Sequence, residues 1–226
     1  MTNQNRLYIV STPIGNYEDI TLRALEILKT VDFIICEEFK EARRLLSRFK
    51  IEKELFSLNE HNREESSREL FEIISSGKSA ALISDCGTPL FSDPGHLLVQ
   101  MCINTNVEVV PVPGASSLMP ALVGSGFNLD RFYYAGWLSP KKELRKTELS
   151  KLKNIKELIV LMETPYRLKA ILTDISKIFG SSCQTVVAFD LTLPSEKFYR
   201  GKASEILKIV ESKNLKGEFV LLINNR

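Results

Sequence analysis

The chain has 226 residues, of which 44% are apolar and 26% are charged. This is an ordinary globular composition, and the length fits one large domain or two domains of roughly 100 residues each. The formal net charge is only +2, which excludes a global basic field for nucleic-acid binding, so any such surface must be local.

Several classes of protein are disfavoured by what the sequence lacks. No stretch approaches the roughly 20 apolar residues that a membrane-spanning helix needs, and the N-terminus MTNQNRLYIV has no signal-peptide pattern. Two histidines disfavour a histidine-rich metal site, and no metal is expected. Four scattered cysteines without CxxC spacing are typical of free thiols, so we expect a cytoplasmic protein.

The first α/β unit begins at the N-terminus. Leu7 to Val10 is a short apolar strand, and the loop STPIGN with Pro13 follows directly. Asp19 is expected to cap a helix, because apolar residues recur at helical spacing from Leu22 to Leu28. Strand, Pro/Gly loop and helix together form the first half of an α/β unit.

The next strand, Val31 to Cys36, ends on two carboxylates, Glu37 and Glu38. Open α/β sheets bind their ligands at the carboxyl ends of strands, so these acids are placed for chemistry. The helix that follows carries Arg43, Arg44 and Arg48, either as a solvated face or as a binding face. A short strand at 56–58 and a helix ending near residue 74 come next.

The stretch AALISDCGTPLFSDPG, residues 80–95, is a buried strand followed by a loop with two glycines and two prolines. A helix at 96–102 and a strand at 107–110 follow, and that strand runs into PVPGASS. Three strands therefore end in Pro/Gly loops, at Pro13, Gly87 and Gly114. Such ends line one edge of an α/β sheet, so the pattern predicts a ligand site. Cys86 has no basic neighbour in sequence that would make it a nucleophile.

A second α/β domain is predicted after a basic segment. A strand is expected at 132–138, and SPKKELRKTELSKLKNIK follows it as a linker and helix, either solvated or in contact with phosphates. Strands at 158–162, 185–189 and 218–223 then alternate with helices at 166–179 and 203–210, with a further segment at 198–201. We therefore expect an N-terminal domain over 1–138 and a C-terminal domain over 139–226.

The loops lack GxxxxGK[ST] and GxGxxG, which disfavours nucleoside triphosphatases and dinucleotide enzymes. The chain instead resembles the tetrapyrrole methylase superfamily of S-adenosylmethionine-dependent methyltransferases, and within it the 16S rRNA (cytidine-2'-O)-methyltransferases. The matching stretches lie in the expected order over nearly the whole chain: STPIGNYEDITLRALEIL, LISDCGTPLFSDPG, VVPVPGASSLMPAL, METPYRL and KGEFVLL.

This resemblance implies two α/β domains with S-adenosyl-L-methionine in the cleft between them. The cofactor-binding positions that it implies in the first domain are Pro13, Cys86, Gly87, Thr88, Pro89, Phe91, Ser116 and Ser117. In the second domain they are Met162, Ala188 and Gly217, of which Met162 and Ala188 offer an apolar surface for adenine.

The implied reaction is methyl transfer to a ribose 2'-hydroxyl of small-subunit ribosomal RNA. A ribose hydroxyl is a weak acid, so a carboxylate at a strand end would assist its deprotonation, and the candidates are Glu37, Glu163 and Asp85. The RNA-binding candidates are Lys40, Arg44, Lys141, Lys142, Arg145 and Arg167. The family also implies a homodimer.

The chain departs from the family pattern at three strand ends. E-D-T-R becomes Glu37-Glu38-Phe39-Lys40, E-S-P-H-R becomes the segment 163–167 with Tyr166 in place of His, and A-R-E-L-T-K becomes AFDLTL at 188–193. The chain also stops soon after KGEFVLL, where many members continue into a further segment. These changes fall at expected RNA contacts and leave the cofactor loops intact.

Two other functions stay open. One is a methylase of a tetrapyrrole or another small molecule, although tetrapyrrole-type members usually carry Gly-Gly-Asp-Pro where this chain has Cys-Gly-Thr-Pro at 86–89. The other is a catalytically weak S-adenosylmethionine-binding module with an interaction role, which the loss of basic residues favours.

Overall fold

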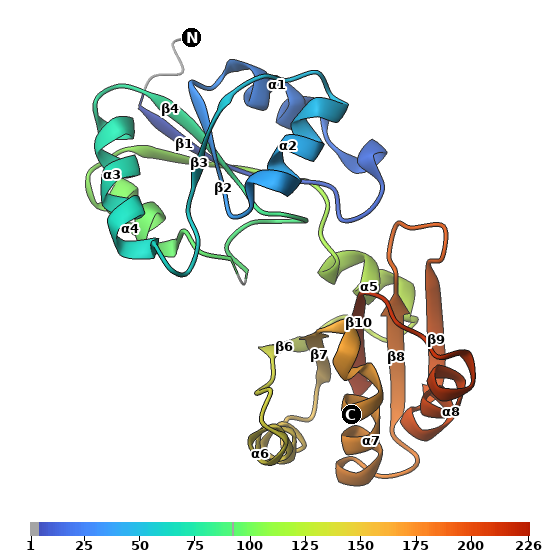
Figure 1. The fold of residues 1–226 in the computed structure, drawn as a ribbon. Coiled ribbons are helices and arrows are strands. Elements are labelled where there is room, and N and C mark those ends of the chain that lie inside the picture. Colours follow the sequence, from blue (N-terminus) through green and yellow to red (C-terminus); the bar gives the residue numbers. More distant parts are fainter. Residues whose placement is uncertain (1–4, 92) are drawn as a thin grey trace. The chain divides into compact units, whose positions relative to one another are not determined.

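The structure is a computed structural model that describes residues 5–91 and 93–226. The chain divides into two compact units between Ser116 and Ser117, and each unit is built around one five-stranded sheet (Figure 1). The elements of the first unit are β1 (Arg6–Val10), η1 (Tyr17–Asp19), α1 (Leu22–Thr30), β2 (Phe33–Cys36), α2 (Phe39–Arg48), β3 (Glu54–Ser57), α3 (Arg63–Ser75), β4 (Ser79–Ile83), α4 (His96–Asn104) and β5 (Glu108–Val112). Those of the second are α5 (Leu118–Ser125), β6 (Phe132–Trp137), α6 (Lys142–Leu152), β7 (Leu158–Glu163), η2 (Pro165–Arg167), α7 (Leu168–Ile178), β8 (Gln184–Phe189), β9 (Lys197–Lys202), α8 (Ala203–Lys213) and β10 (Phe219–Asn224).

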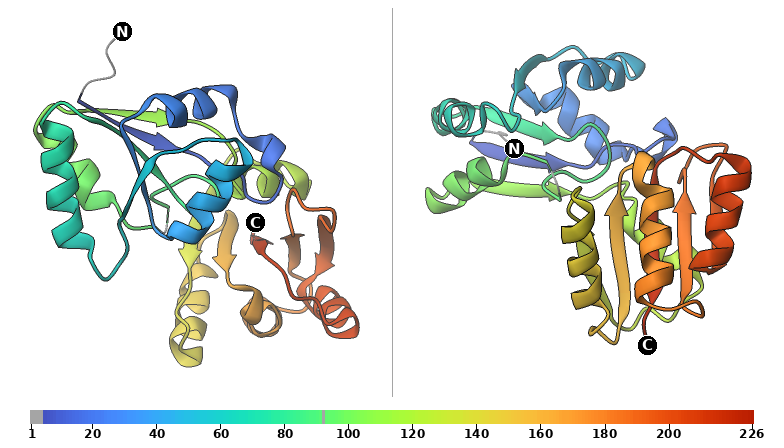
Figure 2. Two further views of the ribbon diagram at one scale, coloured as in Figure 1. Left: turned by 45° about the horizontal axis from the view of Figure 1, so that its top comes forward. Right: turned by 60° about the horizontal axis from the view of Figure 1, so that its bottom comes forward.

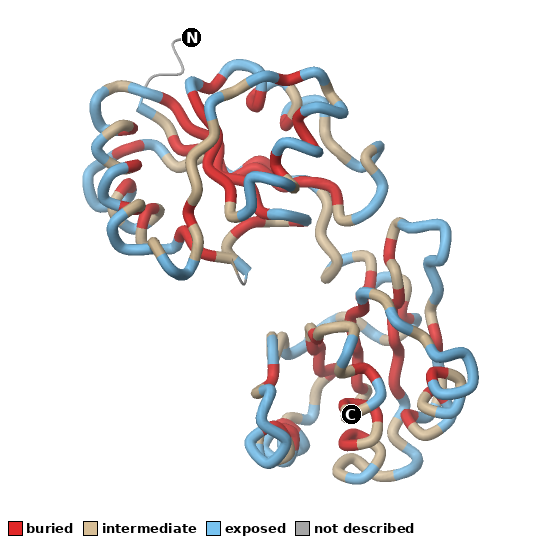
Figure 3. The backbone as a smooth tube through the Cα atoms, in the orientation of Figure 1, coloured by how far each residue is buried: buried red, intermediate tan, exposed pale blue. Residues whose placement is uncertain are grey.

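The first sheet is parallel throughout and runs in the order β3-β2-β4-β1-β5. Its central strands β2 and β4 are buried over their whole length and β1 from Leu7 onward, as the burial colours show (Figure 3). Successive residues of β1 point to opposite faces, so that Tyr8 and Val10 enter one core and Leu7 and Ile9 the other. Continuous apolar strands of this kind need helices on both faces.

The helices of the first unit are sorted by face. Buried residues of α1 and α2, such as Leu28 and Leu45, pack in the same core as Val10. Buried residues of α3 and α4, such as Leu70 and Leu98, pack in the opposite core. The chain leaves β4 toward α4, whereas it leaves both neighbouring strands, β1 and β2, toward α1 and α2. The loop after β4 therefore lies at a topological switch point, where ligands of open α/β sheets bind.

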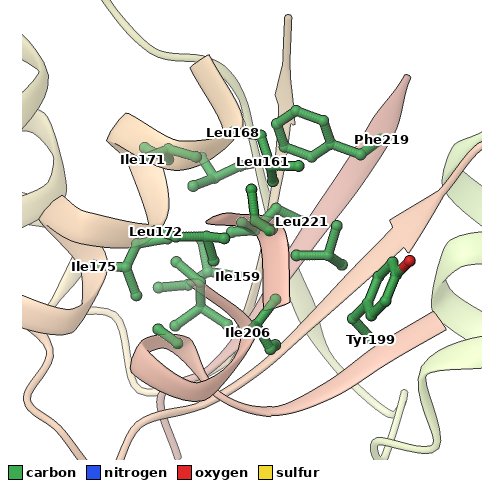
Figure 4. Packing of buried hydrophobic residues seen from close by; sticks show 14 of the residues in the cluster. Ile159, Leu161, Leu168, Ile171, Leu172, Ile175, Tyr199, Ile206, Phe219 and Leu221 are labelled. Carbon is green, nitrogen blue, oxygen red and sulfur yellow. The ribbon is translucent and has the colours of Figure 1, made fainter. Parts of the chain in front are cut away.

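The second sheet is mixed, in the order β6-β7-β10-β8-β9. Strands β6 and β7 are parallel, and the other neighbours are antiparallel. Helices α6, α7 and α8 cover one face (Figure 2, right). Figure 4 shows how side chains from α7, such as Ile171 and Leu172, pack onto Ile159, Leu161 and Leu221 of the strands.

The structure agrees with the expected order of strands and helices and differs at two boundaries. The expected division after residue 138 lies too late, because β6 pairs with β7 and therefore belongs to the second unit, and α5 packs against β10, β8 and β9. Asp19 does not cap α1: it lies in η1, and the Thr21 hydroxyl accepts the Ala24 N–H at 3.0 Å instead. Within the described ranges, no helix is both long and apolar enough to cross a bilayer.

A buried ion pair joins α6 to α7. Arg145 Nη2 lies 2.8 Å from Asp174 Oδ2, and Arg145 Nε donates a hydrogen bond to the same oxygen at 2.9 Å. Both side chains are less than a tenth exposed. The prediction of an RNA contact for Arg145 is therefore wrong, because its guanidinium is buried and already paired. Amphipathic spacing alone does not separate a buried arginine from its exposed neighbours Lys141 and Lys142.

Replacing Arg145 with Ala should lower the free energy of unfolding by about 3 to 5 kcal/mol, because Asp174 is left as an uncompensated buried charge. The double change Arg145→Met and Asp174→Leu should recover most of the loss. Denaturation followed by fluorescence of Trp137, the single tryptophan, reports on the second unit. The exposed Lys142→Ala on the same helix is the control and should change stability by about 0.5 kcal/mol or less. An Arg145→Ala protein as stable as the parent would contradict this assignment.

Candidate functional site

Three loops at the carboxyl edge of the first sheet are tied to one another. The N–H of Thr12 donates to the carbonyl oxygen of Gly87 at 2.8 Å, and the N–H of Gly87 donates to the carbonyl oxygen of Thr12 at 3.0 Å. The hydroxyls of Ser11 and Thr88 are 3.0 Å apart, and Thr88 donates to the carbonyl oxygen of Ala115 at 3.2 Å. The expectation that the three Pro/Gly loops share one edge is confirmed.

Two glycines make this close approach feasible. Gly87 has a φ of +80°, in the left-handed region that side chains avoid. A Cβ on Gly114 would lie 2.9 Å from the Cβ of Ser11, closer than real Cβ contacts. The sequence had suggested that the backbone groups of Gly87 face a ligand. In the structure its N–H and carbonyl are bonded to Thr12, so they hold the loops together.

The predicted cofactor residues of this edge differ in exposure. Pro13, Gly87 and Pro89 are buried and shape the loops, whereas Thr88, Ser116 and Ser117 are half-buried. Cys86 is exposed, and the Phe91 side chain is 54% exposed. Groups that can face a ligand are therefore Cys86, Thr88, Phe91 and the two serines, with the buried prolines behind them. Leu90 has a φ of +75°, so an apolar residue holds a strained conformation in the middle of the loop.

Carboxylates gather at the ends of β2 and β4, as the sequence predicted for Glu37 and Asp85. The Glu38 N–H donates to Asp85 Oδ1 at 3.3 Å. Burial raises the pKa of Glu37, and the charges of Asp85 and Asp93 raise it further. Burial also raises the pKa of Asp85 and of Asp93. Carboxyls with raised pKa values are suited to accept a proton nearer neutral pH.

An open cleft of about 620 Å³ lies beside these acids. Glu37, Glu38, Phe39, Lys40 and Arg43 line it, together with Ser57 at the end of β3. Lys40, predicted to bind RNA, is therefore near Glu37. Arg44, predicted with it, does not line this cleft and lies 3.7 Å from Glu41 in an exposed ion pair.

Three residues of this region were not among the site residues predicted from the sequence. Asp93 was interpreted only as part of a turn. In the structure burial raises the pKa of its carboxyl, and the charge of Asp85 raises it further. Phe39 and Arg43 line the cleft together, and the Arg43 guanidinium carbon lies 5.4 Å from the Phe39 ring centroid. Their i, i+4 spacing on one helix face was the available signal.

In the second unit, Met162 and Ala188 flank Val220 in one row across β7, β10 and β8. They alternate with core residues, so they point to the face opposite α6, α7 and α8. The Tyr134 hydroxyl donates to Met162 Sδ at 3.1 Å, and Met162 is half-buried. Gly217 has no room for a side chain beside Asp190, which explains this glycine by packing within the unit.

Glu163 and Arg167 form an ion pair in which the carboxylate is buried and the guanidinium is half-buried. Arg167 Nη2 lies 2.8 Å from Glu163 Oε1 and donates to the carbonyl oxygens of Leu138 at 2.9 Å and Ser139 at 2.7 Å. The Glu163 side chain is fully buried, and burial raises its pKa although Arg167 opposes the shift. In this structure the pair fastens the end of β6 to β7, and Nη2 of Arg167 binds protein acceptors, whereas the sequence suggested an RNA phosphate for this residue.

Comparison with protein families matches residues 6–207 to the family described as Tetrapyrrole (Corrin/Porphyrin) Methylases. The chain belongs to this family. Its members transfer a methyl group from S-adenosylmethionine, and the chain is accordingly an S-adenosylmethionine-dependent methyltransferase.

Two sequence relatives match over nearly the whole chain. A Synechocystis protein described as ribosomal RNA small subunit methyltransferase I is 42% identical over 217 residues, which cover 96% of this chain and 78% of that protein. A Thermotoga maritima protein of the same description is 39% identical over 221 residues, covering 98% of this chain and 99% of that protein.

Solved structures of the family share the fold. A diphthine synthase superposes with a TM-score of 0.76 at 16% identity, over 96% of this chain and 89% of that one. Uroporphyrin-III C-methyltransferase from Thermus thermophilus, solved with S-adenosyl homocysteine, gives 0.65 at 18% identity over 96% of both chains. These likenesses confirm the predicted fold class of tetrapyrrole methylase type.

The raised pKa of Glu37 predicts a pH-dependent effect on stability. A carboxyl whose pKa is higher in the folded state destabilises the fold when it is ionised, and this cost disappears once the group is protonated in both states. Glu37→Gln should therefore raise the melting temperature at pH 8, and the gain should vanish as the pH falls below about 4.

Thermal unfolding at the two pH values checks this expectation. Glu26→Gln, an exposed change on α1, is the matched control and should leave the melting temperature unaltered at both. A Glu37→Gln gain that persists at low pH would assign the effect to packing and not to charge.

Proposed function

We propose that this methyltransferase methylates a ribose 2'-hydroxyl of small-subunit ribosomal RNA. The observation that carries the proposal is the cleft at the ends of β2 and β3, where the Glu37 and Glu38 carboxylates adjoin the cations Lys40 and Arg43. A ribose acceptor needs a base for its hydroxyl and cations for its phosphates, and this cleft holds both. The relatives named ribosomal RNA small subunit methyltransferase I support the choice of acceptor.

The cofactor supplies a sulfonium-activated methyl group, so the protein's task is to align the attacking oxygen and accept its proton. We assign cofactor contacts at the first sheet edge to Cys86, Thr88, Phe91 and Ser116, with Pro13, Gly87 and Pro89 shaping the loops. Ser117, which begins the second unit, is a further proposed contact. Met162, Ala188 and Gly217 remain the proposed contacts of the second unit. The residues fit such a group: the exposed Cys86 and the half-buried hydroxyls of Thr88 and Ser116 follow the strands of the first sheet, and half-buried Met162 lies in one row with Ala188.

Among the three acids considered as the base, Glu37 suits the role best. Its carboxylate lines the cleft and its pKa is raised. Asp85 is partly held by the Glu38 N–H, and it raises the pKa of Glu37 through its charge. Glu163 is fully buried beside Arg167, so we give that pair a positioning role at the end of β7.

For RNA binding we keep Lys40, Arg44, Lys141 and Lys142, whose side chains are exposed. Arg145 is withdrawn because Asp174 pairs with its buried guanidinium, and Arg167 is withdrawn because its Nη2 is bonded to Glu163 and to two carbonyl oxygens of the protein. A homodimer remains a prediction from the family resemblance, and a cytoplasmic location remains one from the scattered cysteines. Light scattering on the purified protein tests the homodimer.

Small ribosomal subunits lacking 2'-O-methyl marks should accept labelled methyl groups from S-adenosylmethionine. The phosphodiester on the 3' side of the labelled nucleotide should then resist alkaline cleavage, because its 2'-hydroxyl is blocked. Glu37→Gln should lower kcat by roughly 10²-fold or more, because general-base assistance is lost. In the parent protein, activity should rise with pH through the raised pKa of Glu37, and the variant should lose this dependence.

Free ribosomal RNA and a tetrapyrrole precursor are the competing acceptors in the same assay. Label in the tetrapyrrole alone would assign the small-molecule reaction. Calorimetric titration with S-adenosylmethionine should give the same affinity for the parent and for Glu37→Gln. Binding without label in any acceptor would favour a non-catalytic cofactor-binding module and overturn the proposal.

A further inference from the structure

A second cavity of about 630 Å³ lies along α2 and continues the cleft beside Glu37. We call it the α2 groove. Phe39 and Arg43 line both cavities, so the two form one continuous surface at the β3 edge of the first sheet. Beyond these shared residues the groove runs past Lys50, Glu52 and Lys53.

The charge along this surface changes from one end to the other. The cleft has two carboxylates, Glu37 and Glu38, facing the cations Lys40 and Arg43. In the α2 groove the cations Arg43, Lys50 and Lys53 face one carboxylate, Glu52. A polyanion lying along both cavities is therefore attracted more strongly as it leaves the acidic end.

The residues shared by the two cavities are suited to a nucleobase. The Phe39 side chain is 38% exposed, and Arg43 lies over its ring at 5.4 Å. Flat aromatic and guanidinium surfaces are what proteins use to stack the bases of single-stranded RNA. Apolar Leu55 and Ile51 form part of the groove beside them.

We propose that the α2 groove binds the single-stranded nucleotides that flank the methylated one. A flanking base stacks on Phe39 and Arg43, and the phosphates that follow it contact Lys50 and Lys53, while the target ribose lies beside Glu37. Lys53 is held less freely than Lys50, because its ammonium donates to the carbonyl oxygen of Val31 at 2.6 Å. The inference rests on the proposed RNA function and adds which face of the first unit holds the strand.

Fluorescence anisotropy with a labelled oligouridylate of about ten nucleotides tests the groove directly, since this length fits single-strand sites of roughly 4 to 16 nucleotides. Phe39→Ala and Arg43→Ala should each weaken binding by at least about fivefold, which corresponds to the lower limit of base stacking. Lys50→Ala should weaken binding modestly and reduce the dependence of log Kd on log salt by about 0.7, the value for one phosphate contact on a single strand.

Arg48→Ala is the matched control, because Arg48 is exposed on the same helix, lies over Tyr17 at 6.0 Å, and lines neither cavity. It should bind the oligouridylate within twofold of the parent. Thermal unfolding confirms that each variant is folded, and Arg43→Lys, which keeps the charge without the flat guanidinium, should recover only part of the affinity.

A second measurement separates this inference from the proposed function. Oligouridylate carrying 4-thiouridine should crosslink within residues 39–55 of the parent protein. If ribosomal subunits are not methylated but crosslinks and affinity losses occur as expected, the function falls and the groove stands. If subunits are methylated while Phe39→Ala and Arg43→Ala bind RNA as tightly as Arg48→Ala does, the groove inference is overturned, as it is by crosslinks confined to other segments.

Discussion

The reciprocal pair of backbone hydrogen bonds between Thr12 and Gly87 is the constraint on which the first unit's ligand edge depends. Strands β1 and β4 are parallel neighbours, and neighbouring parallel strands normally end with their loops free to separate toward different helices. Here the chain leaves β1 and β4 toward opposite faces of the sheet. The two loops nevertheless stay hydrogen-bonded to each other at one residue pair beyond the strands, Thr12 and Gly87. The Ser11, Thr88 and Ala115 contacts extend the same link to the loop after β5. These hydrogen bonds therefore fix the positions of the three loops relative to one another, and with them the side chains that the loops carry.

The same sheet geometry explains the accumulation of negative charge. Because β2 and β4 are parallel neighbours, residues that follow their last paired positions must lie close together, and here both sequences continue with acids. Burial raises the pKa values of Glu37, Asp85 and Asp93, and the charges of neighbouring carboxylates raise these pKa values further. The fold tolerates this repulsion at the switch point, where destabilising groups are expected if they serve a ligand. Basic residues on α2 stand directly beside it, so opposite charges are separated along one surface within a few residues of chain.

Features that depend on local sequence could be predicted, whereas features that depend on contacts between distant residues could not. Strands such as Leu7 to Val10 are continuous apolar runs followed by loops that contain Pro and Gly, and these loops were correctly placed at one edge. Gly87 was correctly singled out, but its partner Thr12 lies far away in sequence, so only the folded sheet reveals that its backbone is already bonded. Arg145 resembles its solvated neighbours in sequence, and its burial depends on Asp174 of the next helix. The unit boundary was missed because β6 looks like a terminal strand until its pairing with β7 is known.

The chain keeps the pattern of the family that it resembles where residues are held by hydrogen bonds or buried, and it departs from this pattern at positions 39 and 40, where residues are exposed. The loops at 11–16 and 84–89 keep the pattern, and there backbone groups and buried prolines hold one another, so a change at one position strains the others. Phe39 and Lys40, which replace Thr and Arg of the pattern, are exposed residues at the start of α2 and line a cleft open to solvent. An aromatic ring at position 39 exchanges a small hydroxyl for a flat apolar surface, and Arg43 one turn later covers it. The substitution thus removes a hydrogen-bonding group and supplies a stacking surface at the same place. Position 39 therefore changes the lining of the cleft beside Glu37, outside the hydrogen-bond network that ties the three loops together.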